Sequence, residues 1–202
     1  MVGITRFNIV DKWDGRGAQR LAEARQYWSI ANELYRNIFA ALRMPLLPGE
    51  EVIDCTKEEF QAGYDYQLGI DVILRPHYQG ESTLQEKFLF FTGVPTVTIE
   101  HCQDWRTLEP GDWYKLKAQY YFVGYDPYRR GYFDPWVLLN WAALQQASAQ
   151  GRIPWRLTDN NIERVGAKAS FMYVRLCELP QSVIVASSME KQPKQGALPC
   201  QR

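Results

Sequence analysis

The sequence predicts an α+β fold with a mixed α/β arrangement. One long stretch near the N-terminus has helical periodicity, several short segments rich in branched and aromatic residues follow it, and a second helix and a last strand end the pattern. The chain has 202 residues, of which 46% are hydrophobic and 23% are charged. These proportions are typical of one folded domain. We expect residues 1–187 to form that domain and residues 188–202 to be a flexible tail.

The N-terminal helix is expected at residues 21–42. This stretch contains neither Gly nor Pro, and its apolar residues recur at steps of three and four, which is the spacing of one buried helical face. The residues on this face are Trp28, Ala31, Leu34, Tyr35, Ile38, Phe39 and Leu42. The sequence MPLLPG after it ends the helix because proline cannot continue the hydrogen-bond ladder.

Two central segments are expected to form a hairpin. Residues 68–74 read LGIDVIL and predict a largely buried strand, while residues 83–91 read TLQEKFLFF and predict a second one. Arg75-Pro76 and the turn around Gly80 separate them, so a hairpin is the simplest connection. A shorter strand is expected at residues 51–55.

The C-terminal half predicts further strands and one more helix. Residues 95–100 alternate like a strand, residues 111–119 are expected to form a short helix, and residues 120–125 should pair with residues 132–136 across the turn DPYRRG. A helix is expected at residues 137–150, with Pro135 shaping its entry and Gly151 its end. A last strand is expected at residues 171–176.

Charge and cysteine content exclude several classes of protein. Lys plus Arg equals Asp plus Glu at 23 each, so no net positive charge indicates a partner with many phosphates, although metal-binding carboxylates would offset basic side chains in a nuclease. The four cysteines show no CxxC pair, which argues against a zinc or redox motif. The sequence lacks an evident signal peptide and any long apolar run, so we expect a cytoplasmic protein without a membrane partner.

Three side chains on the central hairpin form the strongest candidate for a chemical site. The charge of Asp71 lies within an apolar strand, and such a carboxylate needs a cation or strong donors. Gln85 and Lys87 are two residues apart on the next strand and therefore share a face. Asp71 and Gln85 offer oxygen ligands to a hard cation, while Lys87 can orient a water and stabilise developing negative charge.

The spacing Asp71, turn, Gln85-Glu86-Lys87 resembles the core motif of the PD-(D/E)xK nuclease superfamily. Gln85 replaces the usual acidic residue and is similar to the Mrr-type branch of restriction endonucleases. The resemblance implies a restriction-endonuclease-like core, a mixed sheet flanked by helices, with an additional C-terminal hairpin and helix. It also implies DNA hydrolysis with Mg²⁺ or Mn²⁺, a Glu from the preceding helix at the metal, and a homodimer in many relatives. Glu33 is the candidate for that Glu, with Glu23 as the fallback.

Two basic groups are candidates for contact with DNA. Arg129 and Arg130 lie next to tyrosines and combine charge for phosphates with rings for stacking, although a solvated hairpin turn explains them equally well. Lys115 and Lys117 form the second pair, and their alternation with apolar residues is more simply that of an amphipathic element.

Two other functions remain open. The chain could be a binding or structural protein that keeps a nuclease-like scaffold without catalysis, which the neutral Gln85 and zero net charge favour. Alternatively, Asp71 could act with later acids such as Asp112 or Asp134 in a carboxylate-only nuclease on an RNase H-like sheet. That alternative leaves the shared face of Gln85 and Lys87 unexplained.

Overall fold

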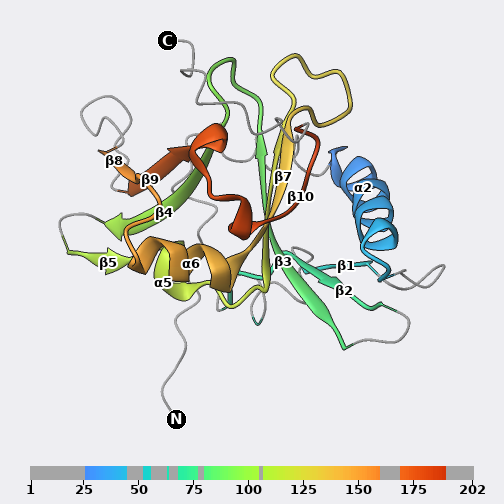
Figure 1. The fold of residues 1–202 in the computed structure, drawn as a ribbon, viewed down its shortest axis with the longest axis horizontal. Coiled ribbons are helices and arrows are strands. Elements are labelled where there is room, and N and C mark those ends of the chain that lie inside the picture. The colour runs from blue at the N-terminus through green and yellow to red at the C-terminus, as the bar shows by residue number, and fades with distance from the viewer. Residues whose placement is uncertain are drawn as a thin grey trace, which may run out of the picture.

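The structure is a computed structural model that describes residues 26–44, 52–55, 63, 68–76, 80–104, 107–159 and 169–189. It confirms the α+β class. A six-stranded sheet forms the centre, helix α2 covers one face, and a four-stranded sheet with helix α6 lies on the other side (Figure 1). Glu23, His77 and residues 190–202 lie outside the described residues.

The central sheet is mixed, as expected. Its strand order is β1-β2-β3-β6-β7-β10, and these strands span Val52–Asp54, Val72–Leu74, Ser82–Leu89, Tyr120–Tyr125, Trp136–Asn140 and Ile184–Ser187. The strands β1, β2 and β3 form an antiparallel meander, whereas β3 and β6 are parallel. The hairpin predicted around Gly80 is therefore present as β2 and β3.

A second sheet, which the sequence patterns did not predict, packs beside the first. Its order is β5-β4-β9-β8, with strands Glu109–Pro110, Thr96–Asp104, Ser170–Arg175 and Arg156–Asp159, all antiparallel. The Tyr121 hydroxyl donates to the Thr98 carbonyl oxygen at 3.0 Å, and the Tyr125 hydroxyl donates to that of Thr96. These bonds join β6 to β4. The two sheets are thus linked by polar contacts as well as by packing.

Each face of the central sheet has its own hydrophobic core. Helix α2, Trp28–Ala41, buries Ala31, Tyr35, Ile38 and Phe39, and the Tyr35 ring meets Phe122 edge-on at 5.1 Å between centroids. This helix lies within the expected range 21–42. Its apolar spacing of three and four residues accounts for the buried stripe, and each such large side chain contributes about 1.5–3 kcal/mol when fully buried.

The boundary between strand β7 and helix α6 differs from the prediction. Residues 132–135 belong to a loop, Trp136–Asn140 forms β7, and α6 spans only Trp141–Ala149. The predicted helix at 137–150 was therefore wrong over its first residues. Val137, Leu138 and Leu139 are all buried because both faces of β7 are covered, and a fully buried strand has the continuous apolar run of a buried helix.

The remaining elements are short. Helix α5 spans Asp112–Lys115, and the 3₁₀ turns η2 and η3 span Leu176–Glu178 and Gln181–Val183. Among the helices that the structure describes, none combines the length and apolar character needed to cross a membrane.

Candidate active site

Asp71 and Gln85 are in direct contact across two neighbouring strands. Asp71 comes immediately before β2, and because Val72 pairs with Leu84, Asp71 faces Gln85. The Asp71 side chain is only 7% exposed. Its Oδ2 accepts hydrogen bonds from Gln85 Nε2 at 2.5 Å and from the Glu86 backbone N–H at 2.7 Å. The buried carboxylate therefore has the strong donors that its position demands.

Lys87 extends the same face of β3 toward the second sheet. It follows Gln85 by two residues, so both side chains leave the strand on one side. Lys87 Nζ lies 5.6 Å from the centroid of the Phe171 ring, which belongs to β9. The structure therefore brings Asp71, Gln85 and Lys87 to one face of the central sheet, where β3 faces β9.

Two carboxylates, Glu100 of the second sheet and Asp112 of helix α5, face Lys87. The sequence suggested Asp112 only for the carboxylate-only alternative and gave Glu100 no assigned role. The pKa of Glu100 is raised to about 7, chiefly by burial and then by the neighbouring Asp112, while the ammonium groups of Lys87 and Lys115 oppose the rise. The pKa of Asp112 is also raised by burial and opposed by Lys87 and Lys115. Both acids thus lie within electrostatic reach of Lys87.

Tyr121 lies within electrostatic reach of both Asp71 and Asp112. Burial raises the pKa of its hydroxyl well above the ordinary range, and the charges of Asp112 and Asp71 raise it further. Tyr121 also pairs with Gln85 in the parallel register of β3 and β6. The candidate site therefore consists of Asp71, Gln85 and Lys87, with Glu100 and Asp112 around Lys87.

Two glycines allow the backbone to come close at this site. Gly69 has a φ of +58°, and a Cβ there would lie 2.6 Å from Leu116 Cδ2 and 3.3 Å from Gln85 Oε1. A Cβ on Gly111 would lie 2.6 Å from the Glu100 carbonyl oxygen. Gly111 therefore permits α5 to begin against Glu100, which brings Asp112 beside it. This glycine before an acid is the local signal that could have pointed to the pair.

The structure does not bring Glu33 to this site. Glu33 is exposed on α2, and α2 packs on the opposite face of the central sheet. Glu86 lies on that opposite face as well, and its Oε1 accepts a hydrogen bond from the Tyr35 hydroxyl at 2.5 Å. Burial raises the pKa of Glu86 to about 8, with the Tyr35 hydrogen bond opposing the rise. The helix thus supplies a buried polar contact rather than a ligand from Glu33.

The four basic residues that were expected to contact DNA lie in three different environments. Lys115 is partly buried beside Glu100 and Asp112, whereas Lys117 is exposed after α5. Arg129 and Arg130 are exposed on the loop between β6 and β7. Asp134 lies on the same loop, exposed, and precedes Pro135 through a cis peptide bond. It does not join Asp71.

The donor set of the site fits a hard cation that keeps much of its water. Within the described ranges, no three His, Cys, Asp or Glu side chains form a cluster that could hold a metal ion. One carboxylate, Asp71, and one amide, Gln85, nevertheless suit Mg²⁺, which commonly binds through one or two protein oxygens, several waters and a substrate phosphate. Such residues could hold Mg²⁺ most effectively when the substrate is present.

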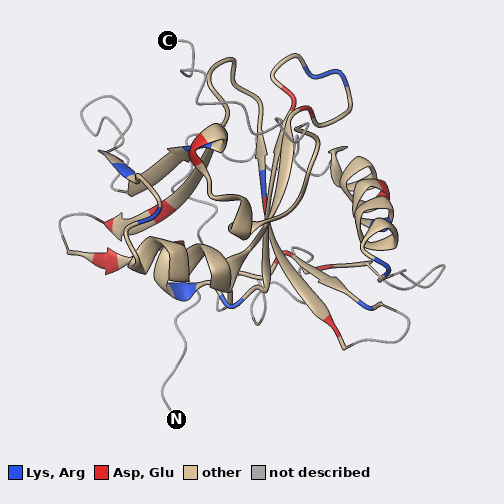
Figure 2. Cartoon of the chain, in the orientation of Figure 1, with Lys and Arg blue, Asp and Glu red and all other residues tan. Residues whose placement is uncertain are grey.

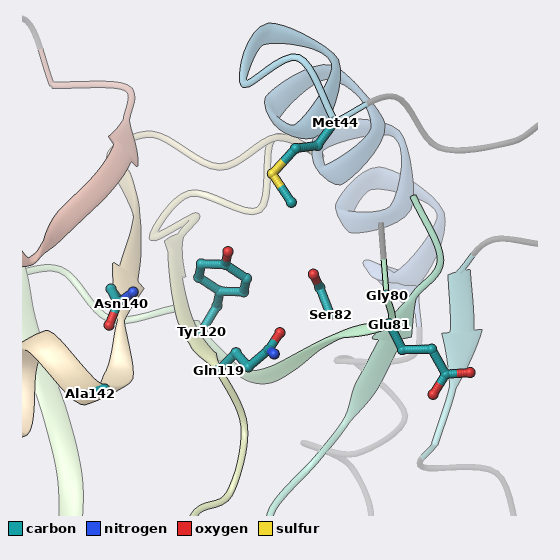
Figure 3. A pocket seen from close by; sticks show the side chains of 8 residues that line it. All are labelled: Met44, Gly80, Glu81, Ser82, Gln119, Tyr120, Asn140 and Ala142. Atoms are coloured by element: carbon teal, nitrogen blue, oxygen red, sulfur yellow. The ribbon is translucent and has the colours of Figure 1, made fainter. Parts of the chain in front are cut away.

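A hollow of about 400 Å³ lies elsewhere, where β3 and β6 begin (Figure 3). Met44, Ser82, Tyr120 and Asn140 are among its lining residues. The carbonyl of the Asn140 side chain already accepts the Ala143 N–H at 2.9 Å. The hollow contains none of the candidate site residues, and we assign it no chemistry.

Comparison with known proteins gives no match: no protein-family model, no curated protein and no solved structure is similar to this chain.

Proposed function

We propose that this chain is a metal-dependent nuclease that hydrolyses phosphodiester bonds in DNA, with Mg²⁺ or Mn²⁺ as its cofactor. The observation that carries the proposal is the contact of Asp71 with Gln85 across β2 and β3, with Lys87 on the same face two residues later. A buried carboxylate, an amide and an ammonium group on one face form the donor set and the cationic group that phosphodiester hydrolysis requires.

The arrangement of strands supports the likeness to the PD-(D/E)xK superfamily. The resemblance requires the Asp on one strand of a mixed sheet and the Gln-x-Lys pair on the next. Here Asp71 adjoins β2, the pair lies on β3, and the neighbouring β6 is parallel to β3. We therefore propose a restriction-endonuclease-like core in β1, β2, β3 and β6, in which strands β4 and β5 of the second sheet lie in the connection between β3 and β6.

Each residue has a distinct role in the proposed reaction. Asp71 and Gln85 would hold the cation, which when bound polarises the phosphate and lowers the pKa of a water. Lys87 would orient the attacking water and stabilise the negative charge that develops on the phosphate oxygens. Phe171 lies against the Lys87 ammonium group at 5.6 Å and helps to fix its position.

The decisive measurement is the rate at which purified protein cleaves labelled DNA with Mg²⁺, Mn²⁺ or EDTA. We expect cleavage with either metal, none with EDTA, and a loss of about 100-fold or more in Lys87→Ala, since a group that transfers protons or stabilises charge contributes at least that much. Arg152→Ala removes an exposed cation after α6 and should cleave like the wild type. Undiminished cleavage by a folded Lys87→Ala variant would refute the assigned role.

A non-catalytic role is the second candidate, and the hydrogen bonds of Asp71 favour it. Both donors to Asp71 Oδ2 come from the protein itself, so this carboxylate also has a structural function at the start of β2. In that case the protein would bind DNA without cleaving it with any divalent metal. An unchanged DNA affinity in Asp71→Asn, together with absent cleavage by the wild type, would support this role over the nuclease.

A further inference from the structure

Two loops meet at one end of the central sheet, where the parallel strands β3 and β6 both end. The β3–β4 loop comprises residues 90–95, the β6–β7 loop comprises residues 126–135, and both extend from the same end of the sheet (Figure 1). The Asp126 N–H donates to the Leu89 carbonyl oxygen at 3.0 Å, so the beginnings of the two loops are bonded together.

Asp126 fixes the conformation of the β6–β7 loop. Its side chain is fully buried and accepts hydrogen bonds from the backbone N–H groups of Arg130 at 2.9 Å and Gly131 at 2.8 Å, and from the Tyr27 hydroxyl at 2.8 Å. Burial alone would raise the pKa of Asp126, but these bonds together hold it below the ordinary value of an aspartate. The loop is therefore organised before any partner binds.

The organised loop presents cations and aromatic rings to solvent. The Arg130 guanidinium lies 4.4 Å from the centroid of the Tyr132 ring and 5.5 Å from that of Tyr128, while the Arg129 guanidinium lies 5.2 Å from that of Phe90. Tyr128 is 69% exposed and Tyr132 is 47% exposed. Figure 2 shows the two basic residues at the outer end of this loop. We call Tyr128, Arg129, Arg130 and Tyr132 the Tyr–Arg surface.

We propose that the Tyr–Arg surface binds unpaired nucleotides, so that the substrate class of the proposed nuclease is DNA with a single-stranded segment. Exposed rings stack on bases whose faces are free, and guanidinium groups bind the phosphates between them. In a continuous duplex the faces of each base are covered by the neighbouring bases. Stacking on the tyrosines therefore adds nothing to the binding of a duplex. The cleavage part of this inference depends on the proposed function, whereas the binding part does not.

The position of this surface relative to Lys87 suits that substrate. Phe90, which contacts the Arg129 guanidinium, directly follows β3, so the Tyr–Arg surface lies just beyond the end of the strand that carries Lys87. Phe90 packs against Tyr27 on the α2 face, whereas Lys87 points toward β9, so a DNA strand would pass between them around the end of β3. A strand that is held at the Tyr–Arg surface could therefore reach the candidate site.

Binding without metal separates this inference from catalysis. Fluorescein-labelled dT20 and a blunt 20-base-pair duplex are titrated with protein in EDTA, and fluorescence anisotropy gives the Kd of each. We expect dT20 to bind at least about tenfold more tightly than the duplex, and Tyr128→Leu to weaken dT20 binding about tenfold, since stacking on one ring contributes that much. Arg130→Gln should reduce the dependence of log Kd on log salt by about 0.7.

Matched variants keep the test independent of folding and of the active site. Tyr114→Leu removes another tyrosine, 56% exposed on α5, and should leave dT20 binding unchanged, as should Arg152→Ala at the exposed cation after α6. Equal binding of dT20 and duplex, or unchanged dT20 binding in folded Tyr128→Leu, would overturn the inference but not the nuclease. Self-association in sedimentation that Tyr128→Leu abolishes would assign the surface to a second copy of the chain, and would also overturn it.

Discussion

Glu86 and Lys87 are neighbours in the chain, yet their side chains point to opposite faces of the central sheet. Glu86 bonds to Tyr35 under helix α2, while Lys87 points toward β9. Alternation along a strand causes this separation. A change at one of the two positions therefore tests the core and a change at the other tests the candidate site, which makes the pair a useful internal comparison.

The raised pKa of Glu86 predicts that stability falls as the pH rises. The folded protein keeps this proton until about pH 8, whereas the unfolded chain loses it near pH 4.5. The folded state therefore binds more protons between these values, and the free energy of unfolding should decrease there by up to about 1.4 kcal/mol per pH unit. Glu86→Gln keeps an acceptor for Tyr35 but cannot ionise, so its unfolding free energy should depend less on pH.

Urea denaturation in EDTA at pH 5.5, 6.5 and 7.5 measures this difference. Glu33→Gln, at an exposed position of α2, is the control and should keep the pH dependence of the wild type. Identical slopes for Glu86→Gln and the wild type would show that Glu86 ionises normally in the folded protein.

The sequence predicted only part of the site because only part of it is local. Asp71, Gln85 and Lys87 lie on one hairpin, and strand alternation is enough to place them on one face. Glu100 and Asp112 reach Lys87 only because the second sheet packs against the first, and its central pair β4 and β9 joins distant segments. The expectation for Glu33 failed because it depended on which face of the sheet α2 covers.

At the scale of elements, β7 leads directly into α6, with no residue between them. Asn140 ends the strand, and its side-chain oxygen accepts the Ala143 N–H at 2.9 Å, which satisfies one of the unpaired donors at the start of a helix. Helical periodicity predicted the body of α6 but missed its start. The residues WVLL before Asn140 are apolar without a break, and such a run fits a buried helix as well as a buried strand. The cap was the available signal for the boundary.

Replacing this cap should destabilise the protein without changing its fold. Asn140→Ala is expected to lower the free energy of unfolding by about 1 kcal/mol, and Asn140→Asp, which can also accept the hydrogen bond, should recover most of it. Urea denaturation of the three proteins measures the effect. A loss of equal size in both variants would mean that the amide acts through another contact.

At the scale of the whole molecule, two tyrosine hydroxyls of β6 hold the sheets together. Tyr121→Phe removes the 3.0 Å bond to the Thr98 carbonyl oxygen and keeps the ring in the core. We expect a loss of about 1 kcal/mol, which corresponds to a fall in Tm of about 2–4 °C for a chain of this length. Calorimetry measures it, with Tyr114→Phe on α5 as the control. An unchanged Tm would mean that the Tyr121 hydrogen bond adds nothing to the stability of the contact between the sheets.

The order in which the chain visits its two sheets also governs how the molecule folds. The chain leaves the central sheet after β3 to build β4 and β5, returns for β6 and β7, leaves again for β8 and β9, and returns for β10. The second sheet is complete only with β9 and the central sheet only with β10, and no single cut would release one of them intact. Such interleaved connectivity favours one cooperative and comparatively slow folding transition.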